Sequence, residues 1–399
     1  MIPKLIRVLF YVLLILFPLG LLLRIKISTN IYIVPQDLIV FLIFVLTCAY
    51  VLKKRINIFL DKFILFQFLF VGIGLISLLV NVWIQKDINF LAAILYAVRY
   101  LSYLSPFFIG SFFMKSKFVS KALYLSGGTL VLIGFIQYFF YNNLRNLFYL
   151  GWDDHLYRLF SSFLDPNFAG VFYVLFFFYL LSKIIKSDYK NSYKELIFSF
   201  FTLVAIYLTY SRTALIALIT TVVAIGIVSK KYKLLFVSII VFLILIVSFS
   251  DLSVEGLNPF RTASSSERIT SLGEAGHIIV KNPILGVGFN AYRYAQLRYG
   301  TRNSIGIAKS NADAGTDNSL IFVLATSGLA GLGCFVLSYF YLLKKLFNEH
   351  LFSSYIIACS IIGLIMGSLF LNVLFYTPII TWLLLVISTR KEFSTIGDK

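Results

Sequence analysis

Long apolar runs alternate with short polar connections along most of this chain. A helix needs about 20 mostly apolar residues to cross roughly 30 Å of hydrocarbon. Runs of about that length predict twelve membrane spans, at 5–23, 31–52, 62–81, 90–112, 122–140, 167–182, 195–210, 213–229, 234–250, 318–343, 353–371 and 373–388. The pattern therefore predicts an all-α polytopic membrane protein, with residues 1–399 forming a single integral membrane domain.

Two connections are longer and more polar than the others, at about 141–166 and 251–316. Lysines gather in alternate short connections, such as Lys53 to Arg55 and Lys230 to Lys233, and clusters of this kind mark the cytoplasmic side. Both termini are therefore predicted to be cytoplasmic, and both long loops extracytoplasmic. Because the orientation rule weakens for long loops, basic residues can remain in the second loop, where they are candidates for binding an anion.

Composition excludes a soluble domain, because 60% of the residues are hydrophobic and only 13% are charged. A net charge of +18 would suggest a nucleic-acid partner in a soluble protein. Here the basic residues sit mainly between apolar runs, so they are interpreted as topology signals and no nucleic acid is expected. Cys48, Cys334 and Cys359 lie inside apolar runs, which indicates neither a disulfide framework nor a thiolate metal site.

The spans 195–210 and 213–229 are separated only by Ser211 and Arg212, so they are predicted to form a tight hairpin. Arg212 would then lie at its extracytoplasmic tip. The sequence leaves two interpretations open for this arginine. It could be a snorkelling side chain at the membrane boundary, or a fixed cation that faces a lipid-linked anion.

An amphipathic helix is predicted in the second long loop. Ser264 and Glu267 form a capping box that would start the helix at about Ser265. One stripe of this helix is expected to face the membrane core, with Arg268 at its rim, and it contains Ile269, Leu272, Gly276, Ile279 and Val280. The opposite face would carry Glu274, His277 and Lys281. His277 would therefore face solvent, which argues against a role as catalytic base.

A turn is predicted directly after this helix. Pro283 ends the helix, and Gly286 and Gly288 permit a tight turn with close backbone approach. No strand precedes this GxG, so it does not indicate a nucleotide-binding unit. The basic segment from Arg293 to Lys309 that follows is expected to be mobile.

The first long loop offers further candidates. Asp153, Asp154 and His155 are adjacent, and adjacent residues seldom converge on one metal ion, so a solvated loop is the preferred interpretation. Arg158 and the Asp165 to Asn167 segment are predicted to lie at the same membrane face as Arg212, where they are candidates for the site. The alternative interpretation of these residues is a helix cap.

One cation lies well inside a span. Arg99 is placed at a depth similar to that of Asp37 in another span, so an ion pair is expected between them. A substrate role for Arg99 is the alternative.

Four motifs together carry a family resemblance: FSSFLDPNFAG, TYSRTALIAL, SERITS followed by KNPILGVGF, and DNSLIFVLATSGLAGL. In their order and spacing they resemble the O-antigen ligase and O-antigen polymerase superfamily of bacterial membrane glycosyltransferases, most closely the polymerase branch. The resemblance covers roughly Arg158 to Gly331. It implies a GT-C-like membrane fold with a large extracytoplasmic loop.

The resemblance also implies a chemistry. A glycan would pass from a polyprenyl diphosphate to a sugar hydroxyl at an extracytoplasmic site, with inversion and without a metal or other cofactor. Arg212 and Arg268 match the arginines that bind the diphosphate in the family, and Arg158 matches a basic residue that commonly precedes the DPN-like motif. Supporting positions would be Asp165, Asn167, Asn318, Arg293 and Arg99.

Asp317 and Asn318 stand where ligases of the family carry a His-Asn pair. This departure favours the polymerase branch, whose members more often tolerate it. Asp317 is expected to act as a base or to orient the acceptor, and an N-cap of the following helix is the alternative.

The expected function is polymerisation of undecaprenyl-diphosphate-linked repeat units for O-antigen, capsule or exopolysaccharide, in the bacterial inner or plasma membrane. The alternatives are a ligase that passes the finished glycan to lipid A-core or another acceptor, and a flippase for lipid-linked oligosaccharides. Transport is disfavoured because the charges concentrate on one face rather than near the midplane. Expected partners are the lipid-linked glycan, membrane lipids, a chain-length regulator and a flippase.

Overall fold

The computed structural model describes residues 1–28, 31–84, 88–150, 152–186, 192–230, 263–301 and 315–390. Within these ranges the chain forms thirteen α-helices. Six helical segments are long and apolar enough to cross a membrane, and one of these, Phe90–Phe113, continues beyond an α-helix through a 3-10 and a π-helical turn. The predicted class of an all-α polytopic membrane protein is confirmed. The predicted span 234–250 lies outside the described residues, and each of the other eleven falls on a described helix.

The helices of the N-terminal half are α1 (Ile2–Leu16), α2 (Pro35–Lys54), α3 (Lys62–Ile84), α4 (Phe90–Ser102), α5 (Ser116–Phe140), α6 (Pro166–Lys186), α7 (Tyr193–Leu208) and α8 (Arg212–Val228). Those of the second half are α10 (Ala263–Lys281), α11 (Tyr292–Arg298), α13 (Ser319–Asn348), α14 (Phe352–Gly367) and α15 (Thr377–Ser388). Two loop segments near the site are short 3-10 helices, Arg145–Leu150 and Ser161–Phe163.

A small antiparallel ribbon joins α1 to α2, which the sequence pattern does not predict. Strand β1 (Ile25–Ser28) pairs with β2 (Ile31–Ile33). Pro35 explains the break, because the residue before a proline is pushed into extended conformation, and Val34 has φ −107° and ψ 142°. The predicted span 31–52 therefore begins as a helix only at Pro35.

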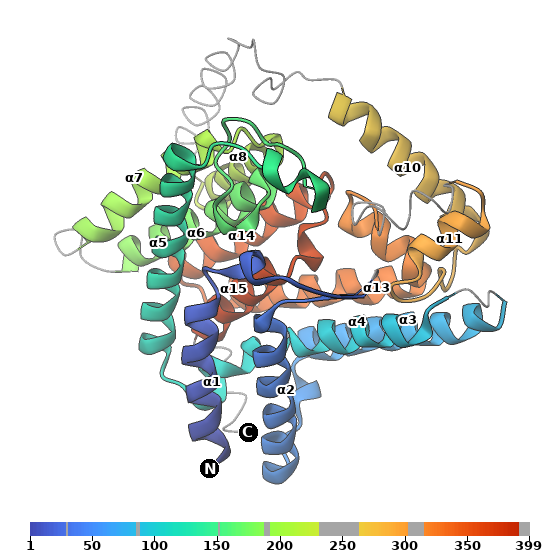
Figure 1. Cartoon of the computed structure of the whole chain (residues 1–399). Helices are drawn as coiled ribbons and strands as arrows, with labels where there is room; N and C mark the ends of the chain where they lie inside the picture. The colour runs from blue at the N-terminus through green and yellow to red at the C-terminus, as the bar shows by residue number, and fades with distance from the viewer. Residues whose placement is uncertain are drawn as a thin grey trace.

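Two sets of three helices cross each other (Figure 1). In this view α1, α2 and α5 run roughly side by side, whereas α3, α4 and α13 run across them. Helix α15 lies at the centre, and every residue from Pro378 to Ser388 is buried. Its Trp382 contacts the rings of Phe172, Phe176 and Tyr179.

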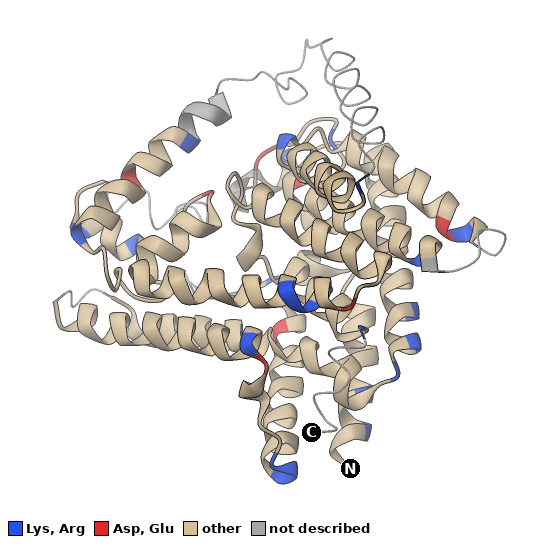
Figure 2. Ribbon diagram, turned by 180° about the vertical axis from the view of Figure 1, so that it is seen from behind, with Lys and Arg blue, Asp and Glu red and all other residues tan. Residues whose placement is uncertain are grey.

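Charged residues lie mostly at helix ends and in connections (Figure 2). Several of the predicted cytoplasmic ends contact one another: Arg7 Nε donates to Phe113 O over 2.8 Å, and Lys345 Nζ lies 2.9 Å from Asp61 Oδ2. These contacts agree with the lysine pattern, which assigns the contacting segments to the same side of the membrane. The side of the membrane on which they lie stays a prediction.

Helix α13 is broken at Gly328, and the loop after α10 docks into the break. Gly328 has φ 64° and ψ −169°, a conformation essentially restricted to glycine. The broken helix accepts hydrogen bonds from Val287 N at Ala325 O (3.0 Å) and from Gly288 N at Thr326 O (2.8 Å). In return, Leu329 N and Ala330 N donate to Pro283 O and Ile284 O at 2.9 and 3.2 Å.

The same loop is held on its other side by α3. Phe289 N donates to Gly74 O (2.9 Å), and Ser77 Oγ donates to Gly286 O (3.0 Å). A Cβ on Gly286 would lie 2.5 Å from Ser327 N, and one on Gly288 would lie 2.6 Å from Leu78 Cα. The predicted close backbone approach at Gly286 and Gly288 is therefore confirmed, and it seats the loop between two apolar helices.

Replacement of Gly328 by alanine should destabilise this docking. A Cβ at Gly328 would lie 2.1 Å from Ile284 O, and the backbone conformation costs a non-glycine residue about 1–3 kcal/mol before any clash. We expect Gly328→Ala to lower the thermal unfolding midpoint of the detergent-solubilised protein. Gly333→Ala is the matched control, because a Cβ there meets nothing within 4 Å. Equal midpoints for the two variants would contradict the docking argument.

Candidate substrate-binding site

The turn between α7 and α8 presents Arg212, as the predicted hairpin requires. The turn consists of residues 209–211, and Ser211 caps α8 by accepting a hydrogen bond from Ala214 N at 3.3 Å. Arg212 is the first residue of α8 and is half-buried. A cation at a helix N-terminus is disfavoured by the helix dipole, so the placement gains from an anion bound nearby.

Arg158 holds this turn in place. It is only 2% exposed, its Nε donates to Thr209 O at 2.9 Å, and its Nη2 lies 3.3 Å from both Tyr210 O and Asn167 Oδ1. These contacts join the loop before α6, the start of α6 and the α7–α8 turn. They favour a positioning role for Arg158 over the direct diphosphate contact that the resemblance implies.

Gln137 in α5 fixes the segment that carries Arg158. Its Oε1 accepts hydrogen bonds from Phe160 N (2.7 Å) and Ser161 N (3.1 Å), and its Nε2 donates to Arg158 O (3.3 Å). The sequence motifs do not single out Gln137. The available signal was a polar side chain within an apolar span, where buried polar groups need partners.

Asp165 caps α6. Its Oδ1 accepts from Asn167 N at 2.7 Å, and its backbone carbonyl accepts from Ala169 N at 3.1 Å. This confirms the helix-cap interpretation of the segment. Gly170 lets α6 approach α8 closely, because a Cβ there would lie 2.7 Å from Ala214 Cβ. The N-termini of α6 and α8 are therefore neighbours.

Asn318, and not Asp317, caps α13. Asn318 Oδ1 accepts from Leu320 N and Ile321 N at 2.9 and 3.0 Å. The N-cap alternative for Asp317 is therefore wrong. Its carboxylate instead lies beside Arg268, with Oδ2 3.9 Å from Nε, and the two side chains are 54% and 21% exposed. The structure thus leaves both charged groups accessible to a substrate.

The pKa of the Asp317 carboxyl group is shifted by opposing influences. Burial raises the pKa of Asp317, the Arg268 cation opposes that rise, and the negative charge of Asp165 adds to it. The interaction with Asp165 links the start of α6 to the start of α13. A carboxylate with a raised pKa is a better proton acceptor than an ordinary surface aspartate.

The face of α10 that packs on the protein differs from the predicted one. Ala275 and Ile278 are fully buried against α11 and α13, and Arg268 lies on this same side. The predicted stripe is largely outside, with Ile269 70% and Val280 79% exposed. The reason is that α10 carries apolar side chains on more than one face, and spacing alone does not show which face meets α11 and α13.

Other residues of the second loop lie away from the Arg268 and Asp317 pair. His277 is exposed, as predicted, and its ring lies 6.2 Å from that of Tyr299. Arg293 is half-buried in α11, whose Tyr292 and Ala295 are buried. The first part of the predicted mobile segment is therefore a packed helix. The side chains of Ser264 and Glu267, and residues 302–314, lie outside the described residues.

The first loop agrees with the solvated interpretation. Asp153 and Asp154 are exposed, and Asp154 Oδ2 lies 3.8 Å from Arg145 Nε. Burial lowers the pKa of His155, while Asp165 opposes that shift. No group of three or more His, Cys, Asp or Glu side chains in the described ranges could hold a metal ion.

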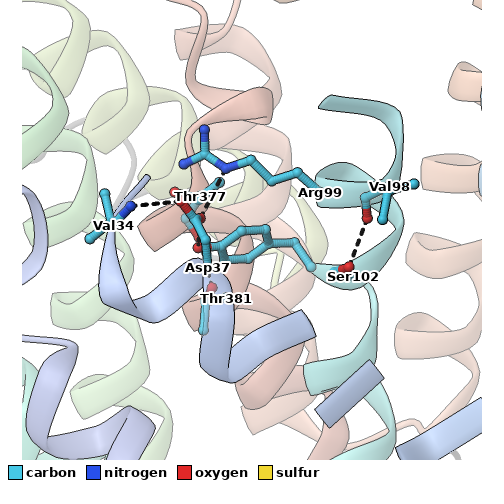
Figure 3. Close-up of polar contacts among 8 residues, drawn as sticks. Val34, Asp37, Val98, Arg99, Ser102, Thr377 and Thr381 are labelled. Carbon is cyan, nitrogen blue, oxygen red and sulfur yellow. Dashed lines mark hydrogen bonds and ion pairs between the residues drawn. The ribbon is translucent and has the colours of Figure 1, made fainter. Parts of the chain in front are cut away.

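The predicted ion pair between Arg99 and Asp37 is confirmed. Arg99 Nε lies 2.9 Å from Asp37 Oδ1, joining α4 to the start of α2 (Figure 3). The same oxygen accepts a hydrogen bond from Tyr103 OH at 2.7 Å. Asp37 also accepts from Val34 N at 2.9 Å, so one carboxylate organises the start of α2.

The fold is that of a polytopic membrane protein, in which Arg212 begins α8 and Arg268 lies beside the accessible Asp317 carboxylate just before α13. Residues 197–336 match the model of a family described as O-antigen ligase. The similarity to this family extends over about a third of the 399-residue chain. A comparison with curated proteins found no match. The matched range contains Arg212, Arg268 and Asp317, whereas Arg158 and Asp165 precede it.

Substitution of Arg158 should affect stability as well as activity. Arg158→Ala leaves the Thr209 and Tyr210 carbonyls without these donors, and a buried unsatisfied group costs about 1–3 kcal/mol. We expect a lower thermal midpoint in detergent. Arg268→Ala and the exposed control Arg145→Ala should change it little, since exposed ion pairs contribute about 0–1 kcal/mol. An unchanged midpoint for Arg158→Ala would refute the positioning role.

Proposed function

We propose that this protein polymerises polyprenyl-diphosphate-linked oligosaccharide repeat units at the extracytoplasmic face of the bacterial inner or plasma membrane. The observation that carries the proposal is the approach of Arg268 to Asp317 in a chain that is similar over residues 197–336 to the O-antigen ligase family. Because Asn318 takes the helix cap, the Asp317 carboxylate remains available for chemistry.

Arginine and carboxylate have complementary roles in this reaction. The anomeric carbon loses its bond to the diphosphate oxygen and gains one to the acceptor hydroxyl oxygen, with inversion. Arg212 and Arg268 would stabilise the charge that develops on the leaving diphosphate. Asp317 would accept the proton from the attacking hydroxyl, so the acceptor oxygen is neutral once bonded. No step requires a metal or another cofactor.

The direction of transfer distinguishes a polymerase from its closest alternative. A ligase would pass the finished glycan to lipid A-core or another acceptor, and the matching family model carries that description. Asp317 and Asn318, in place of the His-Asn pair of ligases, support the polymerase assignment. The flippase alternative is disfavoured because Arg99, the charged residue well inside a predicted span, is already paired with Asp37.

Alanine substitutions at the two arginines should separate these functions in a deletion strain. We expect Arg212→Ala and Arg268→Ala to abolish chain growth, so that a glycan gel shows single repeats on the final acceptor. Arg145→Ala, which removes an exposed arginine of the first loop, should give normal chain lengths. Unattached lipid-linked polymer would indicate a ligase, and repeats trapped in the cytoplasm would indicate a flippase. Normal chains in both site variants would refute diphosphate binding.

The pH dependence of polymerisation should report Asp317. A base must be deprotonated, so activity is present above its pKa and is lost as the pH falls through that value. Because Asp165 raises the pKa of Asp317, Asp165→Asn should move the acidic limb of kcat/KM to lower pH while asparagine preserves the α6 cap. Asp317→Asn should cost most of the activity.

His277→Ala is the matched control for this titration, because His277 is exposed and away from the pair. It should leave both the rate and the acidic limb unchanged. A larger loss from His277→Ala than from Asp317→Asn would refute the assignment of the base.

A further inference from the structure

Left-handed backbone conformations concentrate in one stretch of the first loop. Nine non-glycine residues in the described ranges have positive φ, and four of them lie between residues 155 and 164. Four others lie within two residues after the end of a helix, where this conformation is usual: Arg55, Tyr210, Lys230 and His350. Because left-handed geometry is unfavourable for residues other than glycine, its concentration in a loop beside the site needs a physical cause.

Three of the four residues in this stretch have contacts that account for their conformation. The ring of His155 lies 6.5 Å from that of Phe160. Ser161 Oγ donates a hydrogen bond to Leu130 O at 2.9 Å. Leu164 belongs to a buried cluster with Phe160. In these three cases, contacts of the side chain offset the unfavourable backbone conformation.

Tyr157 is the exception. Its φ is 52°, and 51% of the residue is exposed. It occupies the third position of a turn that Arg158 N closes onto His155 O at 3.3 Å, and glycine or asparagine is favoured at this position when φ is positive. The ring makes no hydrogen bond or ring contact with the part of the chain that the structure describes. Packing therefore does not account for an aromatic residue here.

Tyr157 is held firmly beside the turn that presents Arg212. Its backbone N–H donates to Asn142 O at 2.8 Å. The next residue, Arg158, is buried and donates from Nε to Thr209 O at 2.9 Å. The exposed ring is therefore fixed one residue away from the contact that holds the α7–α8 turn.

The surroundings of the ring indicate what it can bind. Asp153 and Asp154, in the same segment, are exposed, which places this segment in water rather than in hydrocarbon. An aromatic ring in water attracts a ligand with a flat apolar face, and the C–H face of a sugar ring is such a face. The phenol oxygen can form a hydrogen bond with a sugar hydroxyl at the same time. A saccharide therefore suits Tyr157 better than a lipid tail does.

We propose that Tyr157 is a specificity-determining residue that stacks on a sugar of the lipid-linked repeat unit. The proposal deepens the proposed polymerase function and rests on it. No bond forms or breaks at Tyr157, so the ring contributes to the binding of the repeat and not to the chemical step. Loss of the ring should therefore raise KM and leave kcat nearly unchanged.

The kinetics of reconstituted protein with lipid-linked repeats test this role. Tyr157→Ala should raise KM about tenfold, which is the order expected for the loss of one stacked ring, and should keep kcat within about twofold. Tyr157→Phe keeps the ring and should stay close to the wild-type KM. Tyr11→Ala is the matched control, because Tyr11 in α1 is 52% exposed and should leave KM unchanged. An unchanged KM for Tyr157→Ala, or a loss confined to kcat, would overturn the proposal.

Thermal unfolding separates a role in binding from a role in the fold. Glycine adopts a φ of 52° without strain, so Tyr157→Gly should keep or raise the thermal midpoint in detergent. The same variant should raise KM as Tyr157→Ala does. A residue with a structural role would not lose affinity while stability is kept. A midpoint below that of the wild type would show that the ring stabilises the fold, and the proposal would fail.

A free oligosaccharide distinguishes a sugar contact from a lipid contact. The probe is the repeat unit released by mild acid from the lipid-linked substrate of the source cells, and its binding to detergent-solubilised protein is followed by ligand-observed NMR. Tyr157→Ala should bind it about tenfold more weakly than the wild type. Equal binding by both proteins, or binding by neither, would remove the sugar contact and leave the ring to lipid.

The same measurement separates failure of the subsite from failure of the polymerase function. If the wild type forms no polymer and Tyr157→Ala still loses oligosaccharide binding, the polymerase function fails while the sugar subsite stands. If polymer forms and Tyr157→Ala binds the oligosaccharide as the wild type does, only the subsite fails.

Discussion

The exchange of backbone hydrogen bonds at the break in α13 is the interaction on which the site depends. Gly328 breaks the helix, and backbone N–H groups of the loop after α10 donate hydrogen bonds to the carbonyls of Ala325 and Thr326. Two N–H groups of α13 donate in turn to carbonyls of the loop. In hydrocarbon an irregular segment survives only if its polar groups are satisfied by protein. This exchange therefore holds α10 against α13 and sets Arg268 beside Asp317.

A second arrangement of buried hydrogen bonds positions the other half of the site. Gln137 holds the segment before α6, and Arg158 in that segment holds the turn that presents Arg212. The negative charge of Asp165 also raises the pKa of Asp317, so the two halves influence each other electrostatically. The basic residues therefore have different roles. Arg158 is buried and holds the α7–α8 turn in place, whereas part of the Arg268 side chain stays accessible.

Helix α10 shows what hydrophobic periodicity can and cannot predict in this protein. The period correctly predicted a helix ending before Pro283, because helical spacing and proline act locally. It chose the wrong buried face, because α10 carries apolar side chains on more than one face and the period does not show which of them meets α11 and α13. Ala275 rather than Ile269 faces the bundle, since a small residue permits close helix packing.

The sequence by itself determined the membrane class, the positions of eleven described helices and the α7–α8 hairpin, because the length of an apolar run is a local property. It also determined the pairing of Arg99 with Asp37, because an unpaired charge in lipid is costly in any fold. The family motifs also singled out Arg212 and Arg268. Only the tertiary structure decided that Asn318 caps α13 while Asp317 turns to Arg268, since both residues can cap and one residue of register separates them.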